Sequence, residues 1–188
     1  VWSKKGIKVT TGKNNVDRTN DSVVYVGDKN TDNTDRTSDT QGENQSYSVD
    51  VSQLGGMYAD KIHLVDNGQG LGVRNAGHIG ASAGDVKIDS QGRIVNSGTI
   101  SATHQADLNA ENVIENKGKI ETKQGNAALR SQTRVEQHGS IVSRQGGVLL
   151  QTKDKVTQTG ETVAKGDVQY LAKNIEVKSG ALVAAGVT

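Results

Sequence analysis

A pattern of apolar, amide, glycine and small residues recurs about every 21 residues from residue 51 to the end of the chain. Counted from a glycine, an apolar residue stands four positions before and an amide two before, while an apolar residue follows at two and a small one at four. A period of this length indicates a solenoid, in which each repeat packs on its neighbours. The glycines of the pattern are Gly55, Gly77, Gly98, Gly118, Gly139 and Gly160, and Gly180 continues the spacing.

Each repeat also contains a second apolar pair, whose members stand two residues apart. Pairs with this spacing point both side chains to one face of a strand. A second glycine column lies before several of these pairs and marks another corner, so each coil holds three short strands. The pairs are Ile62 and Leu64, Val86 and Ile88, Ala106 and Leu108, Ala127 and Leu129, Val148 and Leu150, and Val168 and Tyr170.

These features predict an all-β fold, a parallel β-helix over residues 49–188 with about 20–22 residues and three short strands per coil. The chain has 32% hydrophobic residues, no Phe and one Trp, which suits a narrow core of aliphatic side chains. A leucine-rich repeat would need a Leu-x-x-Leu-x-Leu frame, which does not occur. An outer-membrane barrel would need aromatic girdles, which so few aromatic residues cannot form.

The separate columns of the repeat have separate expected roles. Ile79, Ile100, Ile120 and Ile141 should stack inside the coil, each on the one below. The column of Asn75, Asn96, Asn116, Gln137 and Gln158 has two interpretations. Its amides form a hydrogen-bonded ladder between coils, or they occupy an exposed turn where Asn tolerates left-handed backbone.

The first 48 residues do not fit the repeat in the same way. Residues 1–27 contain short apolar runs, with Ile7 and Val9 resembling an outlying rung and a second run at Val23–Val26. Residues 28–46 contain no apolar side chain. The segment 28–48 is therefore predicted to be a polar loop or a disordered insertion.

Within that insertion, Asp28, Asn30, Asp32 and Asp39 have positions 1, 3, 5 and 12 of a calcium-loop spacing. Position six is Asn33 in place of glycine, and position nine is the cationic Arg36. The departures favour a polar insertion rich in Asp and Asn over a calcium site.

Charge and cysteine content narrow the classes of partner. The net charge of +1 gives no long-range field for nucleic acid or anionic membrane. The chain has no cysteine, hence no disulfide or thiol chemistry. No apolar run approaches the length of a membrane span, and the start Val-Trp-Ser-Lys-Lys suggests an excised fragment.

Candidate chemistry is sparse, and we expect no catalytic, cofactor-binding or metal-binding residues. The four histidines, His63, His78, His104 and His138, fall at different offsets in their coils, which favours isolated surface positions. Asp85 and Asp167 precede the second apolar pair of their coils and Asp107 lies inside its own pair. The coils between supply Gln105, Asn126 and Gly147 in that column, which argues against paired catalytic carboxylates.

Several segments resemble the filamentous haemagglutinin family of two-partner-secreted exoproteins, which includes adhesins and contact-dependent growth-inhibition toxins. The resemblance covers residues 49–186 and is most specific in Val49–Val65, followed by Gly70–Ala81. Residues Ile94–Ala102 and Glu115–Ile120 are similar to the family's haemagglutinin repeats. The resemblance implies a right-handed parallel β-helix, with residues 1–27 at the trailing edge of a preceding secretion domain.

The resemblance also implies a function without catalysis. The segment would be a rod or stalk of a large surface exoprotein of a Gram-negative bacterium, holding receptor-binding or toxin parts away from the cell. The full-length parent would be exported by an outer-membrane transporter and would meet a receptor on a host or neighbouring cell. The alternatives are a carbohydrate-active β-helix enzyme and a direct glycan-binding module, and long insertions beside one sheet would favour the enzyme.

Overall fold

A computed structural model describes residues 1–11, 47–68 and 71–187 of the chain. These residues form 21 strands in three sheets of seven, and every strand pairing is parallel. In the described residues there is no helix, hence none that could cross a membrane. The first sheet contains β1 (Gly6–Thr11), β4 (Lys61–Asp66), β7 (Val86–Ser90), β10 (Ala106–Ala110), β13 (Ala127–Ser131), β16 (Val148–Thr152) and β19 (Val168–Leu171).

The other two sheets run beside it along the whole rod. The second contains β2 (Val49–Val51), β5 (Gly72–Asn75), β8 (Arg93–Asn96), β11 (Ile114–Asn116), β14 (Arg134–Gln137), β17 (Lys155–Gln158) and β20 (Asn174–Val177). The third contains β3 (Gly56–Ala59), β6 (His78–Ala81), β9 (Thr99–Ala102), β12 (Lys119–Thr122), β15 (Ser140–Ser143), β18 (Glu161–Ala164) and β21 (Leu182–Ala184).

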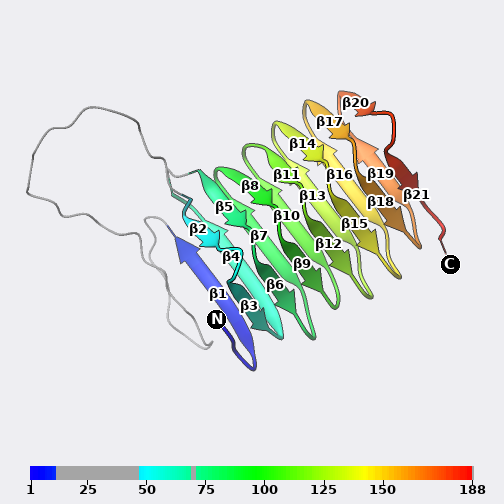
Figure 1. Ribbon diagram of the computed structural model, residues 1–188. Coiled ribbons are helices and arrows are strands. Elements are labelled where there is room, and N and C mark those ends of the chain that lie inside the picture. The colour runs from blue at the N-terminus through cyan, green and yellow to red at the C-terminus, as the bar shows by residue number, and fades with distance from the viewer. Residues whose placement is uncertain (12–46, 69–70, 188) are drawn as a thin grey trace, which may run out of the picture.

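The chain passes through the second, third and first sheets in turn and then begins the next coil one strand spacing further on. Figure 1 shows the coils stacked as a rod, with the N-terminus at one end and the C-terminus at the other. The fold is a right-handed parallel β-helix of about six turns, which confirms the predicted fold class.

The core is a set of vertical columns of aliphatic side chains. Ile79, Ile100, Ile120 and Ile141 lie in one column through the register of β6, β9, β12 and β15, and all four are fully buried. The small residues two positions later are also buried. Burying such β-branched side chains contributes about 1.5–3 kcal/mol each.

The amide column is buried inside the rod and forms a hydrogen-bonded ladder from Asn75 to Gln137, which decides between the two interpretations of the sequence. The Nδ2 of Asn75 donates to Oδ1 of Asn96 at 2.9 Å, and Asn96 donates to Asn116 at 2.9 Å. Asn116 donates to Oε1 of Gln137 at 2.8 Å. All these residues are at most 1% exposed, so the amides supply one another with the hydrogen bonds that water cannot provide in the core.

The glycines at the corner between the second and third sheets are required by close approach of the coils. A Cβ on Gly98 would lie 2.0 Å from the carbonyl oxygen of Gly77, and one on Gly118 would lie 2.0 Å from that of Gly98. The same contact recurs at Gly139 and Gly160. Any side chain in this column would push two coils apart.

Two coils depart from the expected register. Val49, and not Val51, pairs with Val73, so Val51 lies in the amide column beside Asn75. Two additional residues in the following corner absorb the shift, and Leu54 there is 100% exposed.

In the last coil Val183, and not Leu182, pairs with Thr162. Ile175, Val177 and Val183 continue the inward columns and are exposed, because no described coil lies over them.

Residues 1–11 form a partial coil that stacks on β3 and β4, since Trp2 also pairs with Tyr58. Strand β1 pairs with β4 in the order Ile7 with Ile62 and Val9 with Leu64, and Ile7 and Val9 are buried. The expected run at Val23–Val26, the polar insertion and the calcium-loop residues Asp28, Asn30, Asp32 and Asp39 lie outside the described residues.

Candidate functional site

The aspartates considered for catalysis lie along the outer surface where the first sheet begins. Asp85 and Asp167 are exposed and stand in one column, four coils apart. Four strand spacings of about 4.8 Å put them about 19 Å apart. Paired carboxylates of glycosidases lie about 5–9.5 Å apart, so these two cannot act on one bond.

The column has a structural role that the sequence did not reveal. Oδ1 of Asp85 accepts a hydrogen bond from the backbone N–H of Gln105 at 2.9 Å. Oδ1 of Asn126 does the same for the N–H of Gly147 at 2.7 Å. These side chains therefore cap backbone donors of the next coil. Asp107 stands in a different column and has a cation beside it, since Arg130 Nη1 lies 3.4 Å from its Oδ1.

The four histidines lie in different environments. His63 Nε2 is 3.0 Å from Oδ2 of Asp89 on the first sheet, and the ring of His78 packs against Tyr58 on the third, with centroids 5.2 Å apart. His104 is exposed at a corner, and His138 follows β14. As the sequence suggested, they form no common column.

Two grooves follow the outer surface near the N-terminal coils. The larger, of about 820 Å³, lies on the first sheet and is lined by Lys8, Lys61, Lys87, His63, His104 and Asp85 among others. The second, of about 420 Å³, lies on the third sheet and includes Trp2, Tyr58 and His78. Trp2 is 71% exposed and Tyr58 43% exposed, so two aromatic side chains of an aromatic-poor chain face solvent together.

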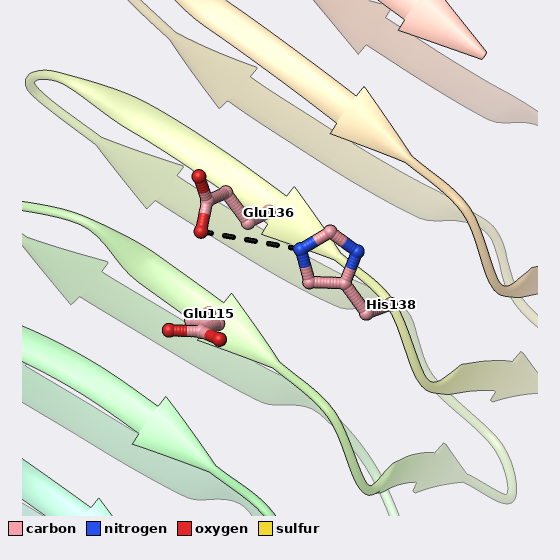
Figure 2. Close-up of side chains that lie close together, drawn as sticks. All are labelled: Glu115, Glu136 and His138. Atoms are coloured by element: carbon pink, nitrogen blue, oxygen red, sulfur yellow. Dashed lines mark ion pairs between the residues drawn. The ribbon is translucent and has the colours of Figure 1, made fainter. Parts of the chain in front are cut away.

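A cluster of two glutamates and one histidine lies across two neighbouring coils of the second sheet. Glu115 on β11 is in register with Glu136 on β14, and His138 stands two residues after Glu136 (Figure 2). One side-chain oxygen or nitrogen of each lies within 4.8 Å of those of the other two. Glu115 and Glu136 are one 21-residue repeat apart, so the sequence contains a signal for this cluster that the offsets of the four histidines do not show.

Cations flank both carboxylates of this cluster. Lys117 Nζ lies 3.0 Å from Glu115, and Arg134 Nε lies 3.2 Å from Glu136. The hydrogen bond to Glu115 raises the pKa of Lys117 above its usual value. The side chains of both cations are more than half exposed, so these ion pairs are weak.

A second charge network crosses the coils on the third sheet. Lys119 Nζ lies 2.8 Å from Glu121, and Arg144 of the next coil donates to the same carboxylate. The hydrogen bond from Lys119, followed by that from Arg144, holds the pKa of Glu121 below its usual value against the opposing effect of burial.

Comparison with known proteins finds relatives but no matching family model and no matching solved structure. The chain is 39% identical over 124 residues to the toxin CdiA of Yersinia pestis, covering 65% of this chain and 3% of that protein. It is 37% identical over 98 residues to the tRNA nuclease CdiA-2 of Burkholderia pseudomallei, covering 52% of this chain and 3% of that protein.

A tRNA nuclease CdiA of Yersinia mollaretii is 38% identical over 76 residues, covering 39% of this chain and 2% of that protein. The chain thus spans only a few per cent of the length of the relatives it matches. These homologues are secreted cell-surface exoproteins of Gram-negative bacteria, which is the location that the resemblance predicts. Over the matched segment the chain is a homologue of the CdiA exoproteins of contact-dependent growth inhibition.

Proposed function

We propose that this chain is a rod segment of a large bacterial surface exoprotein and that it sets the distance between the parts on either side of it. The main support is the unbroken in-register stacking of three sheets from β2 to β21. The strands of each coil form hydrogen bonds with the strands of the next coil, and the buried apolar columns are continuous. Each stacked coil therefore adds one strand spacing of about 4.8 Å to the length of the rod, as a spacer requires.

We infer that the segment has no catalytic role of its own. An enzyme on a β-helix needs acid and base groups that converge on one bond. Here Asp85 and Asp167 lie about 19 Å apart, and Asp107 forms an ion pair with Arg130. The nuclease activity in the names of some relatives belongs to those proteins, of which the chain matches only a few per cent.

The similarity to CdiA supports an outer-membrane two-partner-secretion transporter as the export partner that we propose for the full-length parent. A receptor on a host or neighbouring cell would be contacted by other parts of the parent.

A second candidate, direct contact with a glycan, has one observation in its favour. Trp2 and Tyr58 are exposed together in the groove on the third sheet, with Asp60, Ser101 and Lys123 beside them. Exposed aromatic faces with a few polar groups suit sugar rings. Binding of the chain to a glycan array that is lost in Tyr58→Ala would support this candidate.

Removal of one coil tests the stalk. Deleting 118–138 joins Lys117 to Gly139 and places Ile141 on Ile100 and Gly139 on Gly98, so every column continues. The rod should fold and be shorter by about 5 Å, one strand spacing. In the full-length parent, the deletion should leave surface display and toxin delivery nearly unchanged.

A half-coil deletion serves as the control. Deleting 118–128 removes one strand and part of another, so the isoleucine column loses its register and the chain should not fold. If the whole-coil deletion is folded and displayed but inactive, the stalk is wrong and the removed coil contains a specific site.

A further inference from the structure

The cluster of Glu115, Glu136 and His138 places three metal-ligating groups on the outer face of one coil interface. Glu115 and Glu136 stand opposite each other on adjacent parallel strands, and His138 leaves the end of β14 on the same side (Figure 2). Their ligand atoms lie within 4.8 Å of one another. A tetrahedral ion with bonds of about 2.0–2.1 Å needs ligand atoms about 3.3 Å apart. Rotation of the Glu side chains, which have three rotatable bonds each, covers this difference.

The two carboxylates repel each other in the absence of a cation between them. They lie one strand spacing apart, and their side chains are 20% and 28% exposed, so water screens them incompletely. Lys117 and Arg134 each form an exposed ion pair with the carboxylate of their own coil, and Lys117 also interacts with the charge of Glu136 in the next coil. A divalent ion would neutralise both carboxylates at once and displace only two exposed ion pairs.

The imidazole of His138 is held from outside the cluster. Its Nδ1 lies 2.7 Å from Oγ1 of Thr159, the residue at the equivalent place in the next coil. Its Nε2 faces Glu136, with 4.0 Å between Nε2 and Oε2. Metal-binding histidines have this arrangement, in which a hydrogen bond to one ring nitrogen orients the other toward the ion.

We propose that Glu115, Glu136 and His138 form a surface site for a divalent transition-metal ion that links two neighbouring coils. One imidazole and two carboxylates leave a position for water and suit Zn²⁺ better than Ca²⁺ or Mg²⁺, which prefer oxygen ligands alone. This proposal departs from the sequence-based expectation of no metal site. It does not depend on the stalk function, because it concerns the stability of one coil interface.

Calorimetric titration of the whole chain with Zn²⁺ tests the site. We expect saturable binding of one ion per chain, with the affinity reduced at least about tenfold in His138→Ala and in Glu136→Gln. Thr159→Val, which removes the orienting hydrogen bond, should reduce the affinity by about tenfold or more. The matched control is His104→Ala, an exposed histidine outside the cluster, which should bind as the parent does.

A second measurement reports the link between coils. Zn²⁺ should raise the thermal midpoint of the parent and of His104→Ala, because an ion that binds only the folded state stabilises it. The rise should vanish in His138→Ala, whose own midpoint without metal should be close to that of the parent.

Three outcomes would overturn the proposal. The first is the absence of saturable binding at millimolar Zn²⁺. The second is equal loss of affinity in His104→Ala and His138→Ala, which would assign binding to scattered surface histidines. The third is Ca²⁺ binding as tight as Zn²⁺ binding and insensitive to His138→Ala, which would reduce the site to a pair of carboxylates.

Discussion

Replacing Asn96 by leucine tests how much the internal amide ladder stabilises the rod. The side chain of Asn96 is fully buried, accepts a hydrogen bond from Asn75 and donates one to Asn116. Leucine branches at the same carbon and is somewhat larger, so Asn96→Leu removes the polar contacts and leaves no cavity. The change leaves Oδ1 of Asn116 with no donor among the described residues, whereas Nδ2 of Asn75 keeps its bond to the carbonyl of Thr99 at 3.1 Å.

The magnitude follows from these contacts. A buried acceptor without a partner costs about 1–3 kcal/mol, and the lost bond of Asn75 adds about 1 kcal/mol. We therefore expect Asn96→Leu to lower the free energy of unfolding by about 2–4 kcal/mol. The assay is urea unfolding followed by far-ultraviolet circular dichroism, comparing both the midpoint and the slope. A smaller slope would show that the rod has divided into two cooperative units at the altered coil.

Asn174→Leu is the matched control, because Asn174 is exposed and its side chain hydrogen-bonds to no other described residue. Its effect should stay within about 0.5 kcal/mol. If the two variants unfold at the same urea concentration, or if Asn96→Leu is the more stable, the ladder makes no net contribution to the stability of the rod.

Two further predictions concern the corners and the surface. Gly118→Ala should lower the thermal midpoint strongly although it adds one methyl group, because its Cβ would lie 2.0 Å from the carbonyl oxygen of Gly98; a midpoint equal to that of the parent would show that the coils can separate there without cost. Glu121→Gln should destabilise the rod near pH 7 and lose this effect in acid. The folded pKa of Glu121 is lowered, so its contribution is present above the unfolded pKa and disappears as pH falls through the folded pKa. The unfolding midpoints of the parent and of Glu121→Gln, measured across pH 2–7, should converge at the acid end. A difference that stays constant with pH would show that the charge of Glu121 does not stabilise the rod.

The inward columns were predictable from sequence because they repeat at one position of every coil. Ile100 and Ile120 occupy the same place twenty residues apart, and both are fully buried. The amide column could not be decided in this way, since Asn suits a buried ladder and an exposed turn equally well. Only the side-chain geometry separates the two.

The register predicted for the coil of β2 was wrong for a physical reason. Strand side chains alternate with a period of two, so moving Val51 by two residues leaves it facing inward and leaves the apolar pattern unchanged. The two additional corner residues became visible only through the pairing of Val49 with Val73.

The cluster of Glu115, Glu136 and His138 was missed for another reason. Its members come from two columns and are brought together by side-chain orientation, and the sequence shows only the shared period of the two glutamates.

The in-register stacking of the coils has a consequence for the rate of folding. From β4 onward each strand pairs with the strand of the next coil, 19 to 24 residues further along the chain, and this separation does not increase with the length of the rod. Loop-closure entropy is therefore about the same for every added coil. A chain that emerges from a narrow pore with one end first could acquire its structure one coil at a time. Among the described residues, the N-terminal segment closes a longer loop, since the paired residues of β1 and β4 lie 55 apart.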